Sequence, residues 1–388
     1  MRINPLVAAT APPPVPAAAL WRAAYDGRHG PLVDLAQAVP GVPPPDALLQ
    51  RMAAAAGDPA HAGYGPITGE PALRAALAAD VSALYGAAVA PDEVAITSGC
   101  NEAFAVAMMA VAGRGEEAIV PTPWYFSHKM ALDIQGIVAV PLFCRAADGF
   151  VPSVAAARAL IGPATRAIVL VSPNNPTGAI YPPEVLAGFL ALAREAGIAL
   201  VLDETYRDFL PGGARPHGLF RDPNWRDALI HLYSFSKSYA VPGHRLGAAV
   251  AGRPLLAEVA KVLDCVTICP PRAAQAAVAW AVEGTRGWRT GTRDAVARRA
   301  ALFAAAVAAA PGWSVSAIGA YFAYVRHPLG GSAEAAAERL CAEAGLLALP
   351  GSFFGPGQED HLRFAYPNLG DDAVAGLAER LAILGGAR

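Results

Sequence analysis

The stretch that indicates the fold is Ala199-Leu200-Val201-Leu202-Asp203-Glu204-Thr205-Tyr206. Its apolar run ends in an acid, which is typical of a buried strand in a parallel sheet whose carboxyl end reaches a crevice. The same form recurs upstream, where residues 168–171 lead into Ser172-Pro173-Asn174-Asn175-Pro176-Thr177-Gly178. Each stretch has an ordinary alternative, because an acid after a strand often caps a helix and Asn-Pro is a common turn.

Strands and helices alternate on both sides of this stretch. We expect strands at residues 94–97, 118–121, 137–142, 167–172, 198–203, 229–234 and 247–251. Helices are expected at residues 101–112, 183–196, 255–263 and 273–282. This alternation predicts an α/β fold with a doubly wound, mainly parallel seven-stranded sheet.

The pattern changes after about Gly284. A long helix, expected at 289–310, is followed by expected strands at 313–315, 321–325, 346–349 and 362–366 and by helices at 333–345 and 371–384. We therefore predict an N-terminal arm at 1–45, a large domain at 46–284 and a smaller α+β domain at 285–388, with the arm packing on the small domain. Prolines within residues 5–16 predict an irregular, flexible arm rather than a signal helix.

Composition narrows the class of protein. The chain has 388 residues, which exceeds one ordinary core, and 54% of them are apolar against 16% charged. A net charge of −2 without a basic run makes nucleic acid an unfavourable partner, and no stretch of ~18 apolar residues predicts a membrane helix. The five cysteines form no zinc-binding set, so we expect no metal and a reducing, cytoplasmic compartment.

A candidate reactive lysine lies in Ser234-Phe235-Ser236-Lys237, with Arg245 eight residues later. The amine can form a Schiff base with an aldehyde, while the hydroxyls and the guanidinium can hold a phosphate. Pyridoxal 5′-phosphate (PLP) carries both groups. It also needs a carboxylate against its pyridine nitrogen, which Asp203 could supply, and donors to its phenolic oxygen, which Tyr206 and Asn175 could supply. Alone, the segment could be a surface lysine in a serine-rich turn.

Taken together, the residues resemble the PLP-dependent enzymes of fold type I, specifically the class I/II aminotransferase family related to aspartate aminotransferase. The matching blocks follow the family's order from about Asp34 to Phe364, and their order and spacing are far more specific than any single block. They are Tyr64-Gly65-Pro66-Ile67-Thr68-Gly69, Thr97-Ser98-Gly99-Cys100-Asn101-Glu102-Ala103, Asn175-Pro176-Thr177-Gly178, Asp203-Glu204-Thr205-Tyr206, Ser234-Phe235-Ser236-Lys237, and Pro350-Gly351-Ser352-Phe353-Phe354-Gly355 with Leu362-Arg363-Phe364.

The resemblance implies a phosphate site at a strand-to-helix junction, where backbone N–H groups suit a dianion. Tyr64 is expected to reach the phosphate from a neighbouring subunit, which implies a homodimer with shared active sites; otherwise it is a turn aromatic. Tyr125 is expected to stack on the pyridine ring, with Trp124 as the alternative and a core position possible for either. The groups expected around the phosphate are Gly99, Cys100, Asn101, Ser234, Ser236 and Arg245.

Four residues are expected to bind the substrate: Asn175, already named beside the cofactor's phenolic oxygen, and Arg363, Ala38 and Asp264. Arg363 opens an apolar strand, where a planar guanidinium suits an α-carboxylate and is costly if unpaired; the alternative is a surface arginine on an edge strand. Ala38 stands where the family usually has glycine, which narrows the pocket by a methyl group. Asp264 stands about where dicarboxylate-specific relatives carry an arginine from the partner subunit. It argues against aspartate or glutamate as donor, unless it is only an exposed acid at a helix end.

The resemblance implies ping-pong transamination between an L-amino acid and a 2-oxo acid, with Lys237 as general acid and base, assisted by Asp203 and Tyr206. A PLP lyase or synthase, of the cysteine-conjugate β-lyase or aminocyclopropane-carboxylate synthase type, would share every residue named. The effector module of a transcription regulator is a further alternative, but residues 1–45 show no helix-turn-helix pattern. The intact Lys237, Asp203 and Arg363 argue against an inactive relative.

Overall fold

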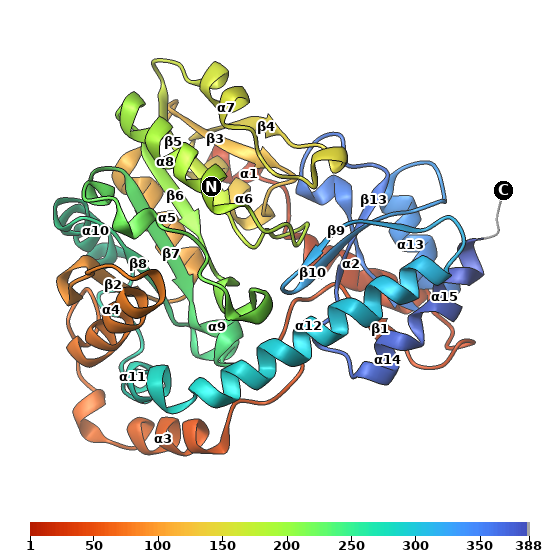
Figure 1. Ribbon diagram of the computed structural model, residues 1–388, viewed down its shortest axis with the longest axis horizontal. Helices are drawn as coiled ribbons and strands as arrows, with labels where there is room; N and C mark the ends of the chain where they lie inside the picture. Colours follow the sequence, from red (N-terminus) through yellow and green to blue (C-terminus); the bar gives the residue numbers. More distant parts are fainter. Residues whose placement is uncertain (386–388) are drawn as a thin grey trace.

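The protein is described by a computed structural model that covers residues 1–385 (Figure 1). Its largest sheet has seven strands in the order β2-β8-β7-β6-β5-β3-β4. All neighbours pair in parallel except β8, which runs antiparallel to both β2 and β7. The predicted α/β fold with a mainly parallel seven-stranded sheet is therefore confirmed. The strands are β2 (Val94–Thr97), β3 (Glu117–Thr122), β4 (Val138–Phe143), β5 (Thr165–Val171), β6 (Ala199–Asp203), β7 (Leu229–Ser234) and β8 (Gly247–Val250).

Helices cover both faces of this sheet, which makes it doubly wound. On β6, Leu200 and Leu202 face one core, and Val201 between them faces the other, as the two-residue period of a strand requires. The first core is completed by α3 (Asp46–Ala56), α4 (Pro71–Tyr85), α7 (Val154–Leu160), α8 (Pro183–Ala196) and α11 (Arg272–Gly284). The second is completed by α5 (Cys100–Val111), α6 (Phe126–Gln135) and α10 (Arg253–Val266).

A smaller antiparallel sheet follows in the order β12-β13-β10-β9. The long helix α12 (Arg286–Ala309) runs from the side of α11 to this sheet (Figure 1). The predicted domain boundaries at 45 and 284 stay a prediction. The strands are β9 (Ser314–Gly319), β10 (Phe322–Arg326), β12 (Leu349–Pro350) and β13 (His361–Ala365), and the other helices here are α13 (Ala333–Ala344), α14 (Asp371–Ala375) and α15 (Leu377–Gly385).

Two predicted elements of this region are divided in the structure. Residues 346–349 form not one strand but two, because β11 (Leu346–Leu347) pairs in parallel with β1 (Val33–Asp34), while β12 pairs with β13. The chain thus changes sheets at Ala348. The single helix predicted at 371–384 is interrupted at Gly376, where a residue without a side chain weakens the helix.

The N-terminal arm contains two short helices, α1 (Pro5–Ala9) and α2 (Pro14–Ala19), where an irregular segment was expected. Each begins with proline at its first turn, a position whose N–H has no helical partner in any case. The side chain of Asn4 caps α1 by accepting from the N–H of Leu6 at 3.0 Å. The arm contacts both parts of the molecule: α1 packs on α6, while the turn at Leu20–Ala24 packs on α13.

Within residues 1–385, no helix is long and apolar enough to cross a membrane.

The turn after β5 meets the smaller sheet at a contact between two glycines. Gly178 has a φ of +78°, and a Cβ added to it would lie 2.4 Å from both Gly319 N and Phe322 O. Both neighbours are backbone atoms of β9 and β10 and cannot rotate away. Only glycine fits at this junction between the turn that carries Asn175 and the smaller sheet.

We expect Gly178→Ala to lower the thermal stability more than the control Gly197→Ala. Gly197 also has a positive φ, +65°, but an added Cβ there meets no atom within 4 Å. The control should therefore show backbone strain alone, ~1–2 kcal/mol, and Gly178→Ala an overpacking cost of about 1–3 kcal/mol in addition. Thermal melts of the two variants, followed by circular dichroism, test this; equal melting temperatures would show that the junction opens without cost.

Candidate active site

A cavity of about 240 Å³ lies where the carboxyl ends of β5, β6 and β7 meet the N-terminal arm and the smaller sheet. Open parallel sheets hold their ligands in this place, because the strand ends and the following turns meet there. The structure brings most of the predicted residues together around it: Ala38, Cys100, Asn101, Tyr125, Asn175, Asp203, Tyr206, Ser234, Ser236, Lys237, Arg245 and Arg363.

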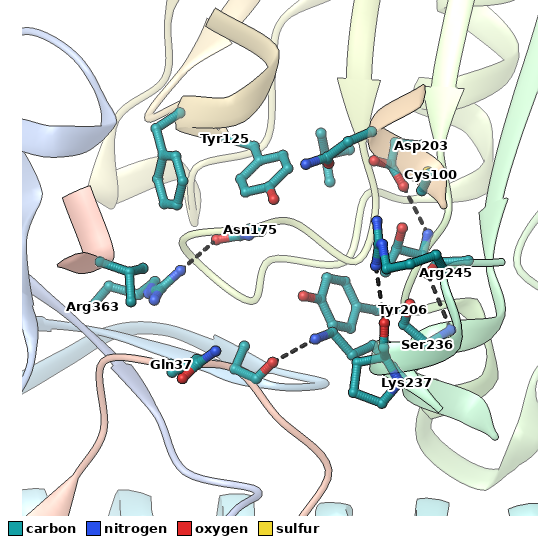
Figure 2. A pocket seen from close by; sticks show the side chains of 18 residues that line it. Gln37, Cys100, Tyr125, Asn175, Asp203, Tyr206, Ser236, Lys237, Arg245 and Arg363 are labelled. Atoms are coloured by element: carbon teal, nitrogen blue, oxygen red, sulfur yellow. Dashed lines mark hydrogen bonds between the residues drawn. The ribbon is translucent and has the colours of Figure 1, made fainter. Parts of the chain in front are cut away.

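Figure 2 shows these side chains on opposite sides of the cavity. Arg363 lies on one side, while Asp203 and Arg245 lie on the other. Tyr125 and Lys237 are placed between the two sides. The cavity therefore has two separate cationic ends with aromatic and amide groups between them.

Lys237 follows β7 on the single turn of α9 (Phe235–Ser238). Its Nζ donates a hydrogen bond to the carbonyl oxygen of Ala38 in the N-terminal arm. Burial, and then the nearby guanidinium groups of Arg363 and Arg245, lower the pKa of Lys237 from 10.5 to about 8. All three causes disfavour the charged ammonium form, so the amine is neutral at a pH where an ordinary lysine is protonated.

Asp203 is the last residue of β6, and its side chain is buried. Its Oδ1 accepts from the backbone N–H of Thr205 at 2.9 Å, and its Oδ2 lies 3.2 Å from Nε2 of His128. Burial alone would raise the pKa of Asp203, but His128 and the Thr205 N–H together hold it below its ordinary value. The carboxylate therefore stays ionised in the cavity wall, so it both caps its own turn and faces the site.

His128 is the main residue that the sequence analysis missed. It lies on the first turns of α6, fully buried, and its ring stacks on Phe104 with centroids 3.9 Å apart. One feature of the sequence could have indicated His128: it lies in the helix that begins just after the carboxyl end of β3, the edge of the sheet where the crevice is expected. The cavity lining also includes Val15, Gln37, Phe126, Val171, Thr205 and Pro242, which sequence reasoning did not select.

The strand-to-helix junction after β2 forms a tight backbone cradle. Gly99 has a φ of +96°, and a Cβ added to it would lie 2.2 Å from Nη2 of Arg245. A Cβ on Gly247 would lie 2.4 Å from the backbone nitrogen of Cys100, the first residue of α5. Glycines at these two positions let the arginine and the start of α5 approach each other closely, as a phosphate-binding site requires. Ser234 and Ser236 line the same part of the cavity.

Arg363 is buried on β13, which lies between β12 and β10, so the alternative of a surface arginine on an edge strand is wrong. Its Nη1 donates to Oδ1 of Asn175 at 3.1 Å and its Nη2 to the carbonyl of Ala36, while its Nε has no hydrogen-bond partner. Burial lowers the pKa of Arg363 to about 10. Within residues 1–385, no carboxylate forms an ion pair with this guanidinium.

The side-chain amide of Asn175 is oriented by Arg363. Because its oxygen accepts from the guanidinium, its nitrogen is the group left toward the middle of the cavity (Figure 2). Tyr206 faces the same space, and burial raises the pKa of its phenol well above the ordinary value, so it stays a hydrogen-bond donor. Tyr125, and not Trp124, lines the cavity.

Two predicted residues lie outside the cavity of their own chain. Tyr64 has 80% of its surface exposed, and Asp264 is exposed near the end of α10. Both were predicted to act across a subunit boundary, and this remains a prediction.

Comparison with known proteins identifies the family. The family model described as aminotransferase class I and II matches residues 30–381, so the chain belongs to this family. It is 31% identical to an aspartate/prephenate aminotransferase of Thermus thermophilus, with 83% of each chain covered, and 34% identical to a valine–pyruvate aminotransferase of Mycobacterium tuberculosis, with 68% of each covered. The solved structure of Thermus thermophilus aspartate aminotransferase with maleate superposes with a TM-score of 0.90 at 29% identity, covering 99% of this chain and 100% of that one.

The protein is therefore a PLP-dependent aminotransferase, as the sequence predicted. The residues that line the cavity fit the chemistry of this cofactor. It offers a primary amine of lowered pKa, a buried carboxylate held ionised, and a glycine-lined junction beside an arginine.

The lowered pKa of Lys237 can be measured in the PLP-free protein. We expect its acylation by an amine-directed reagent, followed by mass spectrometry, to reach half its plateau rate near pH 8, since only the neutral amine reacts. The exposed Lys261 in the same sample reports the reagent's own pH dependence. The folded amine binds fewer protons than the unfolded one between about pH 8 and 10.5, so this group adds stability as pH rises through that window. An acylation rate of Lys237 that reaches half its plateau only near pH 10.5 would contradict the lowered pKa of this lysine.

Proposed function

We propose that the protein moves the amino group of an L-amino acid to a 2-oxo acid in two half-reactions at this one cavity, a ping-pong transamination. The observation that carries the proposal is the buried guanidinium of Arg363 facing the amine of Lys237 across the cavity. The donor and the acceptor both carry a carboxylate next to the reacting carbon. A single fixed cation can therefore hold either of them in turn.

Arg363 is suited to exchange its present partners for a carboxylate. Its two terminal nitrogens donate to a neutral amide and a backbone carbonyl, and Nε lacks an acceptor. A carboxylate accepts two parallel N–H bonds from guanidinium, and such charge-assisted bonds are about twice as strong as neutral ones. Substrate binding would thus give a counter-ion to a buried cation that has none among residues 1–385.

Lys237 is the group we assign to proton transfer. When bound, PLP supplies an aldehyde that takes up amino groups and a ring that draws electrons from the carbon bearing them. The Lys237 amine, with a pKa near 8, is neutral often enough to take a proton from the substrate's α-carbon and acidic enough to return it. The carbonyl of Ala38 accepts a hydrogen bond from this amine and so fixes where it points.

Asp203 and Asn175 are assigned to holding the cofactor's ring. Asp203 stays ionised in the cavity wall and can keep a proton on the pyridine nitrogen, with His128 behind it as a positioning residue. Asn175 presents its amide nitrogen, and Tyr206 its phenol, to the ring's oxygen. Tyr125 is assigned to the ring face, and the cradle of Gly99, Cys100, Asn101, Ser234, Ser236 and Arg245 to the phosphate.

A homodimer would complete the site. Tyr64 stands on an exposed loop that is tied to the segment after α10, because the N–H of Gly65 donates to Sγ of Cys269. At the end of α10 and in the turn that follows it, Val266 and Ile268 are 59% and 40% exposed, and Tyr64 on the neighbouring loop is 80% exposed. Exposed apolar side chains on one loop cluster favour burial by a second copy, which would bring Tyr64 to the partner's phosphate cradle.

We propose a donor whose side chain does not end in a carboxylate. The named relatives do not select one, because their names refer to aspartate and prephenate, to valine and, for one relative in Pseudomonas aeruginosa, to arginine. The support comes from Asp264, which lies two residues before Val266 at the same loop cluster. A carboxylate placed there would repel a second carboxylate on a substrate held in the partner's cavity.

The function is tested with a panel of amino donors, each offered with pyruvate and with 2-oxoglutarate. We expect the purified protein to make a new amino acid from the oxo acid and Lys237→Ala to make none, because that variant lacks the amine for proton transfer. Release of ammonia with pyruvate, or of a cyclised product, without a new amino acid would instead identify a lyase or a synthase.

The role of Asp203 predicts a loss of turnover without loss of cofactor. Asp203→Asn should bind PLP but turn over about 10²-fold more slowly, or ~2.7 kcal/mol in barrier height, since a neutral amide does not hold the ring proton. Asp222→Asn, which removes a half-exposed surface carboxylate paired with Arg194, is the matched control. Steady-state kinetics decide, and near-normal turnover in Asp203→Asn would remove its assigned role.

The proposed donor class predicts a change of preference on charge reversal. Asp264→Arg should raise kcat/KM for aspartate roughly tenfold, equivalent to ~1.4 kcal/mol, through attraction of the second carboxylate. Glu258→Arg makes the same charge change on the same helix at an exposed position paired with Lys261, and should leave the ranking of donors unchanged. A wild type that already prefers aspartate would show that Asp264 does not set specificity.

A further inference from the structure

A second polar pocket of about 320 Å³ lies outside the active site, between the end of α4, the loop after Leu210 and the first turns of α12. None of its lining residues lines the cavity that holds Lys237. Its charged groups are four arginines and two aspartates: Asp80, Arg207, Asp208, Arg286, Arg289 and Arg293. The formal sum of these charges is +2, so the pocket holds more positive charge than its own acids neutralise.

The two aspartates are engaged by the two deeper arginines. Nη2 of Arg207 donates to Asp80 at 2.7 Å, and Nη1 of Arg289 lies 3.4 Å from Asp208. Asp208 also accepts from the hydroxyls of Tyr233 and Ser238, so its capacity is shared among several donors. The two carboxylates of the lining thus pair with the deeper arginines, and the arginines nearer the mouth pair with acids outside the lining, Glu283 and Asp294.

The deep arginines retain donors without acceptors. The side chain of Arg207 has no exposed surface, yet its Nε and Nη1 have no hydrogen-bond partner among the described residues 1–385, and neither has Nε of Arg289. The Tyr233 ring lies 4.0 Å from the Arg207 guanidinium carbon and the Tyr239 ring 4.9 Å from that of Arg289. Rings attract the cation as a whole but do not give the in-plane N–H groups the acceptors that buried donors require.

Each of the two arginines near the mouth pairs with an exposed carboxylate. Arg286 pairs with Glu283 one turn away, and both side chains are more than half exposed, so the pair is weak and easily exchanged. Arg293 lies against the loop, where a Cβ on Gly213 would come 2.3 Å from its Nη1. Its nearest acid, Asp294, is 59% exposed. Arg286, Arg289 and Arg293 follow one another at helical spacing, which directs them to one face of α12.

We propose that this pocket is a binding site for a small oxyanion with two negative charges, either phosphate or a short dicarboxylate. Two charges match the formal sum of +2 over the residues that line the pocket, and the oxyanion would take the place of the exposed carboxylates of Glu283 and Asp294 on Arg286 and Arg293. The planar fork of arginine binds phosphate and carboxylate with paired N–H donors in either case. The site shares no lining residue with the cavity that contains the phosphate cradle, so bound PLP does not occupy it.

The proposal is tested by calorimetric titration of the PLP-loaded protein with phosphate and, separately, with succinate at low ionic strength, where charge attraction is least screened. The pocket variant is Arg286→Gln with Arg293→Gln. The control is Arg298→Gln with Arg339→Gln, which removes two half-exposed arginines elsewhere on α12 and on α13. We expect the wild type and the control to bind the anion. The affinity of the pocket variant should be lower by about tenfold or more. The pocket variant and the control should both keep the transamination activity of the wild type.

The outcomes separate the ligands and the sites. The proposal is overturned if the wild type binds neither anion, or if the pocket variant binds each anion as tightly as the wild type does. Phosphate binding lost in the pocket variant assigns the site to phosphate. Succinate binding lost there assigns it to a dicarboxylate, whereas succinate binding that survives belongs to Arg363 in the active site and counts against a dicarboxylate in the pocket.

Discussion

The rest of the molecule depends on one constraint: the parallel strands β5, β6 and β7 pair in a register that brings their carboxyl ends to the same edge of the sheet. Val171 of β5 lies opposite Asp203 of β6, and Asp203 lies opposite Leu232 of β7. Because the strands run in the same direction and end side by side, the turns after them leave the sheet at one edge. Asn175, Asp203 and Lys237, separated by some sixty residues of chain in all, are therefore neighbours at this edge. Both faces of the sheet must be covered for such a strand set to be stable, which accounts for the two helical layers.

The cavity contains several ionisable groups that find only some of their hydrogen-bond and ion-pair partners within the chain. Arg363 donates to an amide and a carbonyl, and Lys237 donates to a carbonyl, so neither cation has a carboxylate partner among residues 1–385. Asp203 has a histidine beside it and one backbone donor. Removing charges from water costs several kcal/mol per ion in a protein interior. The folded chain therefore carries an unfavourable desolvation free energy in this cavity. Groups of opposite charge on a bound cofactor and substrate would offset it.

Much of the fold and of the cavity could be predicted from sequence, because apolar runs ending in polar turns report parallel strands and their crevice directly. Asp203, Asn175 and Lys237 stand at such turns, so their convergence followed from topology. His128 could not be predicted in the same way, since its proximity to Asp203 depends on how α6 is rotated against the sheet. The strand at 346–349 was divided because its two halves pair with different partners, β1 and β13, and local sequence does not report partners. The pocket beside the arginines of α12 depends on how the loop after Leu210 lies against the helix, which local sequence does not determine.

The contacts of Lys237 join parts of the chain that are made at very different times. Its hydrogen-bond acceptor, Ala38, is 199 residues away in sequence, and Arg363, which helps to lower its pKa, belongs to β13 near the end of the described chain. During synthesis the seven-stranded sheet has all its strands long before β13 emerges. Until the smaller sheet docks, Lys237 lacks Arg363, which after burial is the larger of the two cationic contributions to its lowered pKa. The chemical reactivity of this amine is therefore acquired late in folding, so incomplete chains present a less nucleophilic lysine to the aldehydes around them.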